Sequence, residues 1–103
     1  AQTAAQYEAA LAEVGVPIAS PEVDARLIEI NAGSWHGFTV EGLAEAGRDA
    51  DAEAAAAYRG GSFLARAVDG SGESLLELLA RAAEWLKDLQ HRHAAGDTVV
   101  VFG

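Results

Sequence analysis

The sequence predicts an α/β fold in which a mostly parallel sheet is flanked by helices. Residues 98–102 read Thr-Val-Val-Val-Phe, an apolar and β-branched run that is typical of a buried parallel strand. Residues 73–92 carry apolar side chains at helical spacing along one face. A short strand-like run at 26–30 lies between further helical segments. Helices placed around apolar strands favour an α/β domain.

The first third of the chain is expected to form a helix, a loop and a strand. Apolar residues recur at spacings of three and four over residues 1–14, and Gly15 is placed to end this helix. Residues 19–25 show no sustained periodicity, so they are expected to form a loop or a single turn. The strand at 26–30 reads Arg-Leu-Ile-Glu-Ile.

The middle of the chain is expected to be helical between glycine-rich turns. Residues 31–37 read Asn-Ala-Gly-Ser-Trp-His-Gly, and the two glycines mark backbone that needs special dihedral angles. Thr39 is placed to cap a short helix that ends at about Ala46. Residues 49–58 are Ala-rich and acidic, with good helix propensity, and Gly-Gly-Ser at 60–62 ends this helix.

The long helix at 73–92 gives the clearest local signal. Ser74 and Glu77 fit a capping box at its start. Residues 95–97 turn the chain into the last strand, so that residues 1–103 form a single domain. The apolar face of the helix consists of Leu75, Leu78, Leu79, Ala82, Leu86 and Leu89.

Composition and charge exclude several function classes. The 103 residues carry 16 Asp or Glu and 7 Lys or Arg, a net charge of -9, which argues against binding to nucleic acid or to an anionic membrane. No membrane-spanning stretch and no signal peptide is visible. The absence of Cys removes disulfides and thiolate sites and favours a cytoplasmic location. Because Met is absent, even at position 1, we expect an internal piece of a longer protein, and therefore an incomplete domain.

Glu29 is the candidate catalytic residue that the residue pattern alone indicates. A carboxylate at the end of a short strand, just before a glycine turn, can have a raised pKa and act as a general acid. The alternative is a glutamate at a strand end that points to solvent or pairs with an arginine.

The other polar candidates have structural explanations as well. His36 beside Trp35 can be a ligand or a proton carrier, although a lone His in this setting is more often packed or on the surface. His91 and His93 do not share a helical face, so the sequence predicts no metal site. Three arginines are either contacts for an anionic substrate or solvated surface charges: Arg48, Arg59 and Arg66.

Taken in order, these segments resemble the phosphoglycerate mutase-like histidine phosphatase superfamily. Residues 2–4, Gln-Thr-Ala, are similar to the end of the family's Arg-Ala-x-x-Thr-Ala stretch. Residues 24–37 resemble its D-x-R-L-x-E-x-x-x-G-x-W-x-G signature. Residues 72–74 resemble its Gly-Glu-Ser motif, and residues 98–103 resemble the strand that leads into its second catalytic His-Gly.

The resemblance implies a partial three-layer sandwich, phosphoglycerate mutase-like, whose first central strand is missing from this chain. It implies phosphoryl transfer or phosphomonoester hydrolysis through a phosphohistidine, on a small phosphorylated substrate, with no cofactor or metal. A phosphatase is favoured over a mutase, because a sugar-phosphate mutase usually needs a more basic lid than residues 38–70 supply. The alternative is a non-catalytic binding or assembly module that retains the fold, with an acidic surface that suits a basic partner.

The resemblance assigns functional roles to few residues of this chain. Glu29 matches the family's proton-donating carboxylate. Tyr58 and Arg59 lie in the segment that shapes substrate choice and are candidate substrate contacts, and His36 is a candidate at the rim. The nucleophilic His, the second His and the phosphate-binding arginines fall outside the chain. We therefore expect the 103 residues alone to be inactive, and a homo-oligomer or a complementing chain to complete the fold.

Overall fold

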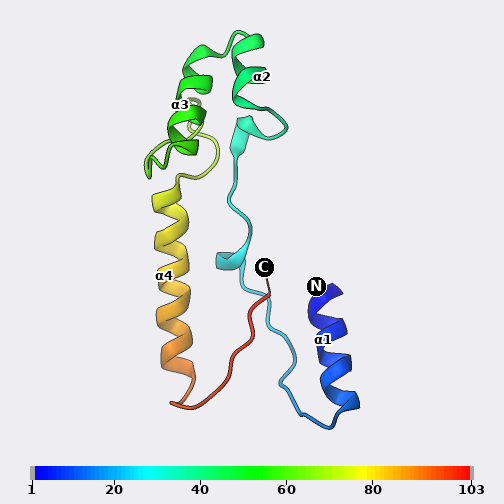
Figure 1. The fold of residues 1–103 in the computed structure, drawn as a ribbon. Coiled ribbons are helices and arrows are strands. Elements are labelled where there is room, and N and C mark those ends of the chain that lie inside the picture. Colours follow the sequence, from blue (N-terminus) through cyan, green and yellow to red (C-terminus); the bar gives the residue numbers. More distant parts are fainter. Residues whose placement is uncertain (1, 103) are drawn as a thin grey trace.

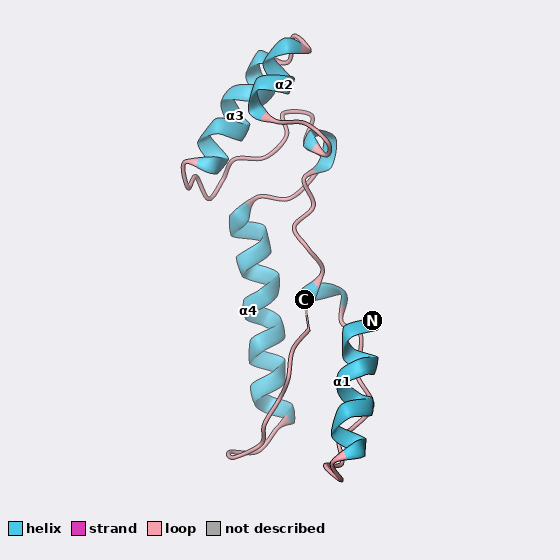
Figure 2. Ribbon diagram, turned by 45° about the vertical axis from the view of Figure 1, so that its right-hand side comes forward, coloured by secondary structure: helices cyan, strands magenta, loops and turns pink. Residues whose placement is uncertain are grey.

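Helices and turns account for the regular structure of residues 2–102, which are the residues that the computed structural model describes (Figures 1 and 2). Within this range no strand is present. The elements are α1 (Gln2–Glu13), the short 3-10 helices η1 (Ala25–Leu27) and η2 (Gly33–Trp35), α2 (Val40–Glu45), α3 (Asp49–Arg59) and α4 (Leu75–Arg92).

The expectation of an α/β fold, a partial three-layer sandwich with a parallel sheet, is wrong for this structure. The expected strand at 26–30 begins instead as η1, because the Asp24 side chain accepts the backbone N–H of Arg26 at 2.9 Å and caps the turn. Residues 98–102 run as a loop (Figure 2). A strand needs a neighbour that pairs its backbone groups, and no such neighbour lies beside this run in the described part of the chain.

The four expected helices are confirmed, because their signals are local. At the start of α4 the Ser74 Oγ accepts the N–H of Glu77 at 3.3 Å, and the Glu77 carboxylate accepts the N–H of Ser74 at 2.7 Å. This is the capping box that the sequence indicates. None of the helices described, the 18-residue α4 included, is apolar enough over sufficient length to cross a membrane.

The packed part of the molecule is the pair α2 and α3, which lie side by side (Figure 1). Leu43 of α2 is 1% exposed and packs with Ala52 and Ala55 of α3, where small side chains allow the two helices to approach closely. Trp35 and Val40 are partly buried against this cluster. The pair therefore has a small core of its own.

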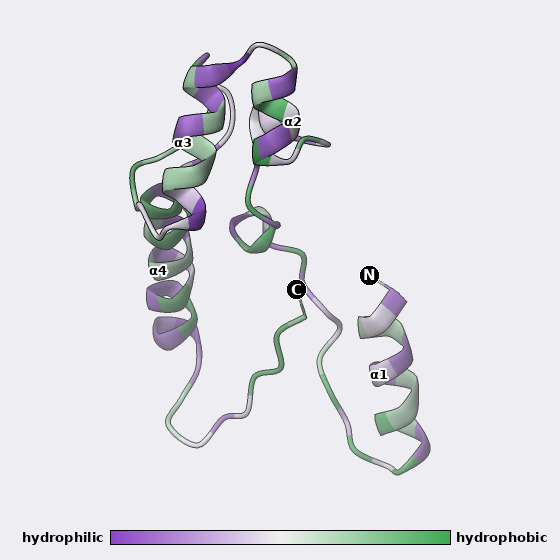
Figure 3. Ribbon diagram, turned by 45° about the horizontal axis from the view of Figure 1, so that its top comes forward, coloured by the Kyte–Doolittle hydropathy of each residue, from purple (hydrophilic) through white to green (hydrophobic). Residues whose placement is uncertain are grey.

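The rest of the chain is extended and exposes apolar surface. The radius of gyration of the chain as a whole is 18.6 Å, against about 13 Å for a compact domain of this length. The accessible surface is 7464 Å², against roughly 5,500 Å² for a compact protein of this mass. Figure 3 shows the hydrophobic run before the C-terminus. A second copy or a complementing chain that buries these side chains stays a prediction. The exposed apolar residues include Leu76, Leu79, Leu86, Val99, Val100 and Val101.

Two segments far apart in sequence cross at Gly33 and Gly72. The N–H of Glu73 donates to the carbonyl of Asn31 at 2.8 Å, so the two backbones lie in direct contact. Gly33 has a φ of +56°, and a Cβ there would lie 2.5 Å from the backbone nitrogen of Gly72. Only glycine fits such a crossing. The crossing joins the turn that precedes α2 to the loop that precedes α4.

We expect Gly33→Ala to destabilise the protein more than Gly37→Ala. Both glycines have positive φ, but a Cβ on Gly37 meets nothing within 4 Å. Gly37→Ala should therefore cost only the left-handed strain, about 1 kcal/mol. Gly33→Ala adds a backbone clash and should cost about 3 kcal/mol or more. Urea unfolding followed by circular dichroism measures both, and equal losses would contradict the crossing.

Candidate functional site

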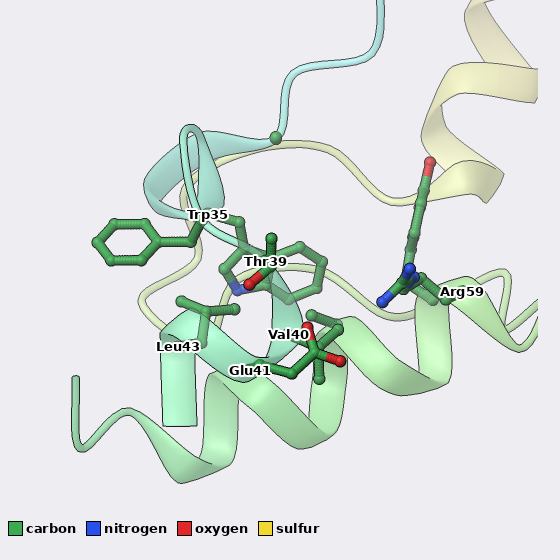
Figure 4. A pocket seen from close by; sticks show the side chains of 10 residues that line it. Trp35, Thr39, Val40, Glu41, Leu43 and Arg59 are labelled. Atoms are coloured by element: carbon green, nitrogen blue, oxygen red, sulfur yellow. The ribbon is translucent and has the colours of Figure 1, made fainter. Parts of the chain in front are cut away.

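A pocket of about 340 Å³ opens beside the α2–α3 core (Figure 4). It is built from the η2 turn, the start of α2 and the last turns of α3. Carbon-rich side chains make up most of its wall, and polar groups are few, as in many small-molecule sites. The lining residues are Ala32, Trp35, Phe38, Thr39, Val40, Glu41, Leu43, Ala55, Tyr58 and Arg59.

Local interactions fix the wall of this pocket. The Thr39 Oγ1 accepts the N–H of Gly42 at 3.0 Å and thereby starts α2, which brings Val40 into the lining. The rings of Trp35 and Tyr58 meet edge to face, with their centroids 6.2 Å apart. This geometry is favourable for aromatic pairs and joins the turn to α3.

Two of the four proposed site residues lie at the pocket, and these two are neighbours in the sequence. Tyr58 and Arg59 both line the pocket, and Figure 4 places Arg59 on the far side of it from Leu43. His36 is exposed and does not line the pocket, although its N–H closes the η2 turn on Gly33 at 3.1 Å. Glu29 lies outside the pocket as well.

Glu29 is exposed, and its Oε1 accepts the N–H of Ile30 at 3.2 Å. The backbone beside it is held by Arg81 of α4, which donates to the carbonyl of Ile28 at 2.8 Å. Arg81 also pairs with Glu73 at 2.6 Å. This pairing lowers the pKa of Glu73 and raises that of Arg81, and the nearby charge of Glu29 contributes to the second shift.

Sequence reasoning missed Arg81. Its guanidinium ties the segment with Glu29 to the start of α4, because it bonds to both Ile28 and Glu73. No helical spacing signals this pair, because Glu73 precedes the N-cap Ser74 and therefore lies outside α4.

Sequence reasoning also missed Asp51, whose carboxylate is 12% exposed. It accepts the indole N–H of Trp35 at 2.8 Å, the backbone N–H of Val68 at 2.9 Å and the guanidinium of Arg48 at 2.8 Å. The bond from Val68 and then that from Trp35 are the main causes of a lowered Asp51 pKa. The carboxylate therefore fixes the orientation of a pocket wall without lining the pocket.

Ion pairing distinguishes the three arginines of this region. Arg48 is paired with Asp51 at 2.8 Å, and Arg66 with Glu77 at 3.0 Å. Arg59 has no carboxylate partner among residues 2–102, and it lines the pocket together with one acidic residue, Glu41. The arrangement can bind an apolar group next to a single anionic group.

No cluster of three or more metal-ligating side chains occurs in the described part of the chain.

A family model described as the histidine phosphatase superfamily (branch 1) matches residues 1–103. A search of curated proteins and a search of solved structures each found no match.

We expect Asp51→Asn to reduce the acid sensitivity of the protein. Because the folded-state pKa of Asp51 is lowered, its stabilising effect is present above the ordinary carboxyl pKa of about 4 and is lost as the pH falls below that value. The variant should be less stable at neutral pH and should lose less of its stability on acidification. Urea unfolding at neutral and acidic pH measures this.

Asp49→Asn is the matched control, because Asp49 is exposed and lies in the first turn of the same helix. The control should keep the wild-type dependence of stability on pH. If Asp51→Asn and Asp49→Asn behave alike, Asp51 does not organise this region.

Proposed function

The chain belongs to the histidine phosphatase superfamily, and on this premise we propose that the complete protein hydrolyses phosphomonoesters through a phosphohistidine. Membership implies phosphoryl transfer or hydrolysis in general. One observation favours hydrolysis of a small monophosphate over a mutase reaction. Of the three arginines in residues 38–70, Arg59 alone has no carboxylate partner among residues 2–102. A bisphosphate-binding mutase needs more positive charge than one guanidinium supplies.

Glu29 is the proposed general acid. Its carboxyl group is exposed, so a bound substrate can reach it, and Arg81 fixes the neighbouring backbone through Ile28. In the proposed first step, a histidine nitrogen forms a bond to phosphorus, the bond from phosphorus to the leaving oxygen breaks, and Glu29 gives its proton to that oxygen. Water then attacks phosphorus, the phosphorus–nitrogen bond breaks and releases the free histidine and inorganic phosphate, and the ionised Glu29 takes the proton of that water.

The nucleophile in this proposal is not one of the three histidines of this sequence. His36, His91 and His93 do not stand in an Arg-His-Gly sequence, which carries the nucleophile in the family. The resemblance assigns that role to a part of the complete protein beyond these 103 residues. The 103 residues by themselves are therefore proposed to be inactive.

Tyr58 and Arg59 are the proposed substrate contacts. Support comes from the pocket, which both residues line, and from the Arg59 guanidinium, which can pair with an anionic group. His36 is proposed at the rim only, next to the wall residue Trp35.

In the complete protein, Glu29→Gln should lower kcat/KM for an alkyl phosphate by about a hundredfold or more. The loss should be much smaller for p-nitrophenyl phosphate, because nitrophenolate is a weak base that leaves without a proton. Steady-state hydrolysis of both esters measures the difference.

Glu84→Gln is the control, since Glu84 is also exposed, lies on α4 and makes no side-chain hydrogen bond within the described residues. Equal losses for the two esters would overturn the role of Glu29 as proton donor. Absence of turnover in the unaltered complete protein would favour the alternative, a non-catalytic binding or assembly module.

A further inference from the structure

We propose that the pocket beside α2 and α3 holds the alcohol part of the substrate, and that this part is planar and apolar. The substrate is then an aryl phosphomonoester with a single phosphate group. The presence of a phosphate group in the substrate rests on the proposed function, and the nature of the alcohol part rests on the pocket itself.

The wall of the pocket fits a flat apolar group. Trp35 and Phe38 contribute aromatic surface, and Val40 and Leu43 contribute aliphatic surface (Figure 4). Aromatic walls favour planar ligands, because a ring can stack on them or meet them at its edge. Burial of such a group removes apolar area of both ligand and pocket from water.

Two polar groups of the pocket are already engaged within the chain. The indole N–H of Trp35 is already donated to Asp51 at 2.8 Å, and the hydroxyl oxygen of Thr39 accepts the N–H of Gly42 at 3.0 Å. A sugar carries several hydroxyl groups, and each one that loses water without gaining a partner weakens binding. The polar lining groups that remain are Tyr58, Glu41 and Arg59, and we expect the phosphate to take Arg59, which leaves few partners for the hydroxyl groups of a sugar.

The charges of the pocket limit the number of phosphate groups. Arg59 is the cation among the lining residues, and Glu41 on α2 is an anion in the same lining. The other two arginines of the region are held by Asp51 and Glu77. A second phosphate would meet the negative charge of Glu41 without a second guanidinium to balance it.

Binding of non-hydrolysable phosphonates to the complete protein tests the inference without catalysis. Naphthylmethylphosphonate and glucosylmethylphosphonate carry the same anionic group on different organic parts. Calorimetry should give a Kd about tenfold lower for the naphthyl compound. Equal affinities, or tighter binding of the glucosyl compound, would overturn the inference.

A pair of variants assigns the binding to this pocket. Phe38→Ser removes aromatic wall, and Phe63→Ser is matched to it, because the two rings are 48% and 53% exposed and Phe63 does not line the pocket. Phe38→Ser should weaken binding of the naphthyl compound about fivefold, and Phe63→Ser should leave it unchanged. Circular dichroism verifies that both variants keep their helices.

If Phe38→Ser and Phe63→Ser bind the naphthyl compound equally well, the group binds elsewhere and the inference is overturned. The test separates this inference from the proposed function, because it measures affinity and not turnover. A naphthyl preference that depends on Phe38 supports the pocket even if Glu29→Gln leaves hydrolysis unchanged.

Discussion

The carboxylate of Asp51 is the group on which the organised part of this molecule depends. It accepts hydrogen bonds from Trp35, Arg48 and Val68, which lie before α3, at its start and well after it. A partly buried anion with three donors is much more costly to leave unpaired than an exposed one. Its partners are therefore fixed together, and the pocket wall at Trp35 is fixed with them.

Elements that depend on local signals could be predicted from the sequence, and elements that depend on distant partners could not. The cap at Ser74 and the helix that follows it are encoded within a few residues. A strand at 98–102 also has the right composition, but composition does not supply the neighbour that a ladder requires. Residues 26–30 do not form the predicted strand either, because the Asp24 side chain caps a 3-10 helix at their start.

The contacts around the candidate site divide in the same way between local and distant partners. Tyr58 and Arg59 were predicted from their place in the segment 38–70 and line a pocket, but their role as substrate contacts stays a prediction. Asp51 and Arg81 were missed, because important partners are distant in the sequence: Val68 lies 17 residues from Asp51, and Arg26 lies 55 residues from Arg81.

Residues 98–102, which lack a paired strand in the described part of the chain, affect how the isolated chain behaves at high concentration. Its three valines are exposed by 39% to 49%, and its backbone groups have no ladder partner within residues 2–102. Short β-branched segments with free backbone donors and acceptors pair with copies of themselves. The isolated chain is therefore an aggregation hazard that grows with concentration, and a charged residue in place of Val100 would oppose that growth by electrostatic repulsion.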